Sequence, residues 1–346
     1  HTWTMNIYRL LHFYQRVKSP RIKLLGILVL HICHQRYLSV NIDPVLSCNF
    51  RCKMCYFSDE KTVKSLHGRF SSDDLKAIAR ALFSRTLRLQ IGCGAEPTIS
   101  QNLLELVQLG KRYGVKHITI TTNGNLLTYE KLYELVASGL TELTISAHGF
   151  TKNTYENLMV NGKFELFTTL IQNLKRIKTS FPNFHIRLNY TINADNAAEL
   201  IHLKDIFKDI NPDVIQIRPI QCIGDSAYNN FSLKEIENNY LKWIKPVIDY
   251  CKQMNITCIY PTISSLNTLD DKNDQEGKSN KFIDMLPYFY MAPYKGWKEK
   301  LDPYDENFED YAKRTHRLRA ILKTLIGINT AKEEHSKTKI LNYQIK

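Results

Sequence analysis

The sequence predicts an α/β fold built on a parallel sheet. From residue 37 onward, short apolar segments of strand character alternate with longer segments of helix character. Regular alternation of this kind argues for parallel strands joined by right-handed crossovers. The 346 residues are 43% hydrophobic, which supports a substantial core, and 23% charged, which fits a soluble protein. Alternation alone does not separate a barrel from an open, doubly wound sheet.

Seven segments have strand character. The first covers residues 37–42 and ends at Asp43 and Pro44. The others are expected at residues 87–91, 117–121, 142–146, 185–192, 214–218 and 256–260.

Helices are expected between these strands. Ser71 and Asp74 supply the Ser-x-x-Asp start of a capped helix that runs to about residue 84. Further helices are expected at residues 103–113, 129–137, 164–178 and 197–208. Ser232 to Glu235 reads as a capping box that opens a later helix, and Pro246 should kink that helix.

Three cysteines dominate the loop after the first strand. Cys48, Cys52 and Cys55 have C-x3-C-x2-C spacing. Three thiolates on one tight loop can hold three corners of a four-iron cluster and leave one iron without a protein ligand. A zinc site on the same cysteines is the alternative, with His67 or Cys93 as fourth ligand. We expect no disulfide framework, because eight cysteines in a long chain without a secretory signal indicate a reducing, intracellular setting.

The cysteine loop resembles that of the radical S-adenosylmethionine (SAM) enzymes. The spacing matches fully, although Met54 stands where the family commonly has an aromatic residue and Tyr56 follows the last cysteine instead. The resemblance implies a [4Fe-4S] cluster on Cys48, Cys52 and Cys55, with SAM bound at the open iron as the source of a 5′-deoxyadenosyl radical. It also implies a partial (β/α)6 barrel over residues 38–260, whose active site would gather at the carboxyl ends of the strands.

A second motif follows the second strand. Gly94, Ala95, Glu96 and Pro97 are similar to the family's Gly-Gly-Glu-Pro motif, whose backbone and Glu contact the amino group of SAM. Glycine lets a backbone approach a ligand closely, and here Ala95 replaces the second one. An ordinary strand-to-helix turn is the alternative reading.

The later strands end in residues that the resemblance places near SAM. Asn123 and Ser146 follow the third and fourth strands, and Asn189 and Arg218 lie on the fifth and sixth. Asn123 precedes Gly124, which is also a common turn pair. Arg218 suits a carboxylate by its bidentate geometry, with surface ion pairing as the alternative.

The cysteines after the sixth strand differ in their expected roles. Cys222 lies just past the sixth strand, where a thiol could give hydrogen to a substrate radical or simply be buried. Cys251 and Cys258 are expected in the core. No cysteine follows Cys258, so the resemblance is to members without the cysteine-rich, SPASM-type extension that holds auxiliary clusters.

Composition suggests three parts: a basic, apolar helical segment over residues 1–36, the barrel over 37–260, and an aromatic-rich extension over 261–346 that caps the barrel. Residues 267–281 are expected to form a loop. The net charge of +13 is concentrated at the two ends of the sequence. The apolar run at 24–33 is shorter than the roughly 20 residues of a membrane span, so we expect a buried or interfacial helix.

These features limit the expected partners. The resemblance implies an organic substrate, such as a peptide or an envelope or natural-product small molecule, and an electron donor such as flavodoxin or ferredoxin. We expect no nucleic acid, because aromatics as dense as those near residues 288–311 usually pack. The location expected is cytoplasmic, with peripheral membrane contact suggested by the basic, apolar N-terminal segment.

Overall fold

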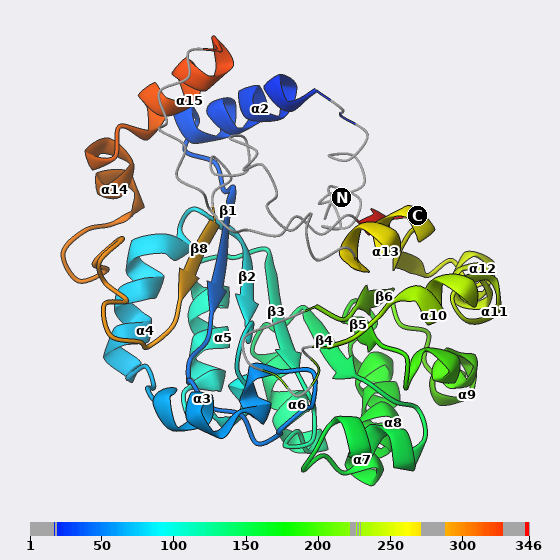
Figure 1. Cartoon of the computed structure of the whole chain (residues 1–346). Helices are drawn as coiled ribbons and strands as arrows, with labels where there is room; N and C mark the ends of the chain where they lie inside the picture. The colour runs from blue at the N-terminus through cyan, green and yellow to red at the C-terminus, as the bar shows by residue number, and fades with distance from the viewer. Residues whose placement is uncertain are drawn as a thin grey trace.

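The strands form one open sheet with helices along its outer face (Figure 1). The computed structural model describes residues 17, 19–221, 226, 228, 230–270, 288–327 and 343–345. Within this part of the chain the sheet has nine strands in the order β8-β1-β2-β3-β4-β5-β6-β7-β9. Because β8 and β9 are free edges, the sheet does not close, and the expected partial barrel is confirmed.

All neighbouring strands pair in parallel except β9, which is antiparallel to β7. The strands expected from the sequence are confirmed to within a residue or two at each end. Their bounds are β1 Leu38–Ile42, β2 Thr86–Ile91, β3 His117–Thr122, β4 Glu142–Ala147, β5 His185–Ile192, β6 Val214–Pro219, β7 Thr257–Pro261, β8 Tyr288–Met291 and β9 Tyr343–Ile345.

Helices cross between successive strands. The Ser71 hydroxyl and the Asp74 carboxylate form the expected capping box at the start of α4. The α-helices are α2 Pro20–Ile32, α3 Glu60–Ser65, α4 Ser72–Ile78, α5 Leu103–Arg112, α6 Tyr129–Ala137, α7 Lys152–Leu158, α8 Phe164–Ser180, α9 Leu203–Phe207, α10 Lys234–Asn238, α11 Tyr240–Trp243, α12 Lys245–Gln253, α13 Ile263–Asp270, α14 Phe308–Arg314 and α15 Arg317–Leu325. None of these described helices has the length and apolar content needed to cross a membrane.

Two helix predictions are wrong in detail. The capping box at 232–235 is absent: the Ser232 hydroxyl accepts from the Lys234 N–H, and α10 begins after Leu233, whose side chain is buried. In place of one helix with a kink there are three short ones, and Pro246 lies in the first turn of α12. Residues 267–270, expected in a loop, belong to α13, and the rest of that predicted loop up to 281 lies outside the described residues.

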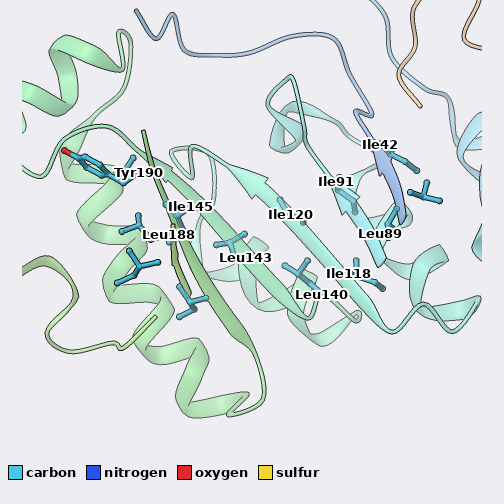
Figure 2. Packing of buried hydrophobic residues seen from close by; sticks show 14 of the residues in the cluster. Ile42, Leu89, Ile91, Ile118, Ile120, Leu140, Leu143, Ile145, Leu188 and Tyr190 are labelled. Atoms are coloured by element: carbon cyan, nitrogen blue, oxygen red, sulfur yellow. The ribbon is translucent and has the colours of Figure 1, made fainter. Parts of the chain in front are cut away.

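Alternating residues give the sheet an apolar face and a polar face. Apolar side chains from neighbouring strands, among them Ile91, Ile120, Ile145 and Leu188, are fully buried and lie in a row across the sheet (Figure 2). Their neighbours in sequence are polar and bind one another across strands. This division fits a barrel wall that is packed against helices outside and lined with polar groups inside.

The polar face holds a buried charged group near the start of the strands. Glu142 on β4 is fully buried, accepts from the Thr119 hydroxyl at 3.2 Å and lies 3.8 Å from His117 Nε2. Burial lowers the pKa of His117 to about 4, although the charge of the Glu142 carboxylate acts to raise it. His117 is therefore neutral in the folded protein at pH 5 to 7.

We predict that stability falls on mild acidification because of His117. The unfolded chain protonates this residue below its ordinary pKa of 6.5, and the folded chain only below about 4. Between these values the unfolded state binds more protons, so stability is lost as the pH falls; at pH 5 this amounts to about 2 kcal/mol. Urea unfolding of His117→Gln and wild type at pH 7 and pH 5 measures it: the variant should lose about 2 kcal/mol less. An equal loss in both proteins would contradict the prediction.

The aromatic-rich stretch expected as a cap contributes an edge strand and two helices. β8 pairs with β1, so the sheet continues beyond the six-stranded barrel core. Phe308 at the start of α14 is buried and packs edge-on against Tyr37, just before β1, and against Phe289 on β8. Arg85, just before β2, binds Glu309 of α14. These contacts hold α14 and α15 at the end of the barrel where the strands begin. The division of the chain into three parts at residues 36 and 260 stays a prediction.

Candidate active site

The three cysteines lie where the parallel strands end. Their loop connects β1 to the short helix η1 (Tyr56–Ser58), at the opposite end of β1 from α2 (Figure 1). Cys48, Cys52 and Cys55 are half-buried free thiols. Among the described residues no three His, Cys, Asp or Glu side chains are placed to hold a single metal ion.

Burial keeps these thiols protonated in the absence of a positive partner. It raises the pKa of Cys48 to about 12, and the pKa values of Cys52 and Cys55 also lie above the ordinary thiol value. Backbone N–H groups already point at two of the sulfurs: Phe50 N donates to Cys48 Sγ at 3.4 Å, and Tyr56 and Phe57 donate to Cys55. Such donors suit sulfur that carries negative charge, and bound iron deprotonates a coordinating thiol outright. The donor set therefore fits an iron–sulfur cluster.

The cysteine loop is fixed on one side by the connection after β4. Arg51 N donates to Val160 O and Lys53 N donates to Leu158 O, both at 2.9 Å. Met54, in the position where the resembling family commonly has an aromatic residue, is buried, and its sulfur accepts from Asn193 Nδ2 at 2.9 Å. The loop is thus held by backbone and side chain between the cysteines.

On its other side the cysteine loop is joined to the loops after β2 and β3. The Tyr56 hydroxyl donates to Gly94 O, and Glu96 N donates to Ser47 O at 3.0 Å. Asn123 Nδ2, after β3, donates to Asn49 Oδ1 at 2.9 Å. The cysteine loop, the Gly94–Glu96 loop and Asn123 therefore form one connected unit, and the S-adenosylmethionine contacts expected of Gly94, Glu96 and Asn123 stay a prediction.

Glu96 is a candidate ligand contact, and its side chain also links the loop after β2 to the end of β3. Its buried carboxylate accepts from Thr98 N at 3.1 Å, from the Thr122 hydroxyl at 2.7 Å and from Asn123 N at 2.8 Å. The Thr98 hydroxyl also donates to it. Among the hydrogen bonds of the described residues, only that of Asn123 falls on Oε2, and because a carboxylate oxygen has two lone pairs, Oε2 retains one acceptor position.

Asp43 is a site residue that sequence reasoning missed. Its buried carboxylate accepts from Cys93 N at 2.7 Å, from Gly94 N at 3.0 Å and from the Tyr290 hydroxyl at 2.6 Å. Asp43 therefore ties the end of β1 to the Gly94 loop and to β8. An acid directly after a barrel strand was the available signal; Tyr290 gave none, because it lies far away in sequence.

The expected residues of the later strands lie in register. Ser146 on β4 is opposite Asn189 on β5, and Arg218 on β6 is opposite Thr191, further along the same edge. All are half-buried, and Asn189 Oδ1 accepts from Arg187 Nε at 3.1 Å.

His148 directly follows β4 and is not among the site residues expected from the sequence. Its Nδ1 is buried and has no hydrogen-bond partner among the described residues. Burial lowers the pKa of His148 to about 4, and the charge of Arg218 adds to this effect. The ring is therefore neutral near pH 7, and its unpartnered nitrogen is a polar position that a bound ligand would satisfy.

The other cysteines divide as follows. Cys222, the candidate hydrogen donor, lies outside the described residues. Cys251 and Cys258 are buried, which confirms their expected place in the core.

Comparison with known proteins agrees with this geometry. Residues 42–202 match the family described as the Radical SAM superfamily, a range that holds the cysteine loop and strands β2 to β5. Residues 42–202 therefore form a region of the radical SAM type.

Radical SAM relatives resemble the chain over part of their length. "Probable GTP 3′,8-cyclase" of Saccharolobus islandicus is 24% identical over 194 residues, which is 55% of this chain and 60% of that protein. Its counterpart in Sulfolobus acidocaldarius is 25% identical over 55% of this chain and 59% of that protein. The chain thus spans about 60% of the length of these curated relatives.

Solved radical SAM structures share the fold. SuiB of Streptococcus suis bound to the precursor peptide SuiA superposes with a TM-score of 0.55 at 17% identity, over 78% of this chain and 60% of SuiB. SuiB bound to S-adenosylmethionine gives a TM-score of 0.54 at 16% identity, over 75% of this chain and 58% of SuiB. At this identity the likeness concerns the fold alone.

Proposed function

We propose that the chain is a radical SAM enzyme that abstracts hydrogen from an organic substrate. Cys48, Cys52 and Cys55 would hold a [4Fe-4S] cluster with one iron open to S-adenosylmethionine. When bound, the reduced cluster supplies the electron that cleaves S-adenosylmethionine to methionine and a 5′-deoxyadenosyl radical. The observation that carries the proposal is the connected unit of cysteine loop, Gly94 loop and Asn123 at the carboxyl end of the strands.

In this proposal the chain's own residues bind and orient S-adenosylmethionine. The free acceptor position on Glu96 Oε2 suits the ligand's ammonium group, and the Ala95 backbone borders the same loop. Arg218 suits its carboxylate, because a guanidinium binds a carboxylate in bidentate fashion. Ser146 and Asn189 offer hydrogen bonds to the ribose.

His148 adds a recognition group to that side of the site. Its Nδ1 has no partner among the described residues, and it follows the strand that carries Ser146. Because burial keeps the ring neutral, Nδ1 can accept from a hydroxyl or amino group of the ligand. This position supports binding on the β4–β6 side as well as at the cysteine loop.

The substrate and the reductant are proposed by class only. An organic substrate, either a peptide or an envelope or natural-product small molecule, fits an open barrel whose inner face is polar. An electron donor such as flavodoxin or ferredoxin would reduce the cluster, and Cys222 remains a candidate hydrogen donor. A cytoplasmic location with peripheral membrane contact is part of the same proposal.

Metal analysis and turnover test the proposal. After anaerobic reconstitution with ferrous iron and sulfide, about four iron and four sulfide per chain are expected. Addition of dithionite and S-adenosylmethionine should release 5′-deoxyadenosine. Zinc without sulfide would instead support a zinc- or partner-binding module on the same cysteines, and a fully loaded cluster that releases no 5′-deoxyadenosine would refute the enzymatic proposal.

Gly94→Ala should weaken S-adenosylmethionine binding without removing iron. A Cβ at Gly94 would lie 2.7 Å from the Tyr56 hydroxyl and 3.3 Å from Asp43 Oδ2, so the loop must shift. We expect Kd to rise about tenfold, as for changes that disturb the support of a metal site. Isothermal titration of the reconstituted protein measures it. Gly26→Ala is the matched control, because a Cβ there meets nothing within 4 Å; unchanged affinity in Gly94→Ala would contradict the assignment of this loop.

A further inference from the structure

Two helices from opposite parts of the sequence lie side by side where the barrel strands begin (Figure 1). Arg21, at the start of α2, reaches within 3.8 Å of the position of a Cβ on Gly327, just after α15. Arg317, at the start of α15, acts electrostatically on His31 near the end of α2. The two helices therefore run antiparallel.

Helix α2 is apolar on its outer face as well as its inner face. Leu24, Ile27 and Leu28 are buried against the protein. Large apolar side chains also point to solvent at positions spaced by three or four residues: Ile22, Leu25, Val29 and Ile32. A surface helix ordinarily has a polar outer face. Helix α5 of the same protein follows that rule, since its exposed positions are Gln108, Lys111 and Arg112.

Helix α15 repeats this pattern beside α2. Ile321 is buried, whereas Leu318, Leu322 and Ile326 form an exposed stripe with a spacing of four residues. Among the described residues, eight of the nineteen exposed large apolar side chains lie on α2, on α15 or directly after α15. Such a concentration marks an interaction surface rather than scattered surface residues.

The charge on these helices indicates what the surface meets. Residues 20–32 and 317–327 contain no Asp or Glu. They carry five cations: Arg21, Lys23, Arg317, Arg319 and Lys323. The Arg317 guanidinium is directed at the rings of Phe308 and Tyr37, so the charge of the outer surface comes from the other four. Exposed apolar residues among cations without acids complement a bilayer surface with anionic headgroups. At 13 residues α2 is too short to span a bilayer, which takes about 20, so it would lie along the interface.

We propose that the surface formed by α2 and α15 binds the protein to an anionic lipid bilayer. The cysteine loop follows β1 and α2 precedes it, so the candidate active site lies at the far end of the barrel from the membrane. Five-residue β1 alone separates the two ends by about 16 Å. A substrate would therefore reach the site from the aqueous side. The proposal names a partner for the peripheral contact suggested above and does not rest on the proposed chemistry.

Vesicle co-sedimentation of the full chain tests it. Vesicles of phosphatidylcholine with one quarter phosphatidylglycerol should bind the protein at least about tenfold more tightly than phosphatidylcholine alone, because each cation near an anionic surface contributes about fivefold. The triple variant Leu25→Gln, Val29→Gln, Leu322→Gln should lose at least about tenfold in binding. The matched control Leu166→Gln, Ile201→Gln, Leu241→Gln removes three apolar residues elsewhere that are at least as exposed on average and should bind like wild type.

A second variant makes the test independent of how the triple variant folds. Tryptophan at the exposed position Leu25 (Leu25→Trp) should shift its emission to the blue and be quenched by brominated lipid, whereas Leu241→Trp should not. No difference between the two vesicle types, or wild-type binding by the triple variant, would overturn the proposal. So would self-association through this surface without vesicle binding, which would identify a second copy of the chain as the occupant. None of these measurements requires a cluster or S-adenosylmethionine.

Discussion

Cys52→Ala should abolish the brown colour of the reconstituted protein and reduce 5′-deoxyadenosine release to the level seen without protein. Burial, together with the charges of Cys48 and Cys55, raises the pKa of the Cys52 thiol well above its ordinary value. Loss of one ligand exposes a second iron of the proposed cluster and removes the arrangement in which a single iron is open. Iron content, the visible absorbance of the iron–sulfur cluster and product release together measure the effect.

Two cysteines provide matched controls for that experiment. Cys33 is exposed at the end of α2, and Cys93 lies on the loop that the Tyr56 hydroxyl contacts through Gly94. Cys33→Ala and Cys93→Ala should keep iron, sulfide and activity. If Cys93→Ala also lost its metal, a four-thiolate site would be favoured, and with zinc bound this would support the non-enzymatic alternative. Full activity in Cys52→Ala would remove the basis of the proposed function.

The strands were predictable because each is a short local pattern. β5 covers the expected residues 185–192, and its side chains alternate strictly between buried and half-buried positions. The helix expected at 197–208 begins instead as a 3₁₀ helix, η4 (Ala197–His202), followed by the short α9. Just before η4, the Asn196 side chain donates to His148 O and Thr191 O. The bond to His148, which follows β4, joins residues 48 positions apart and has no counterpart in local sequence.

The candidate site also combines features that the sequence shows with contacts that only the fold creates. The spacing of the three cysteines and the Gly94–Glu96 motif are visible in the sequence. The Glu96 carboxylate also accepts a hydrogen bond from the Thr122 hydroxyl, and this contact could not be predicted because the two residues lie 26 positions apart. The resemblance placed Asn123 near ribose or methionine, whereas its amide contacts Asn49 of the cysteine loop. Motifs therefore indicate which loops take part, and folding decides which atoms remain free for a ligand.

Asp43→Ala should destabilise the fold by about 4 kcal/mol. The substitution leaves three buried hydrogen-bond donors without an acceptor, each of which costs about 1–3 kcal/mol, and water that enters the space offsets part of this cost. The donors are Cys93 N, Gly94 N and the Tyr290 hydroxyl. In a chain of this size, whose unfolding entropy is about 0.7 kcal/mol/K, such a loss lowers Tm by about 5–6 °C. Calorimetry or denaturant unfolding of the purified variant measures it.

Two conservative variants separate the bonds that Asp43 makes. Tyr290→Phe removes a single donor and should cost about 1 kcal/mol. Asp43→Asn keeps one oxygen for the N–H groups of Cys93 and Gly94, and its amide can donate to the Tyr290 oxygen, so most of the stability should return. Burial raises the pKa of Asp43, which means that part of the carboxylate's favourable bonding offsets its own desolvation. A melting temperature for Asp43→Ala equal to that of Tyr290→Phe would show that β8 alone depends on Asp43, and that the Gly94 loop keeps its place by its bonds to Tyr56 and Ser47.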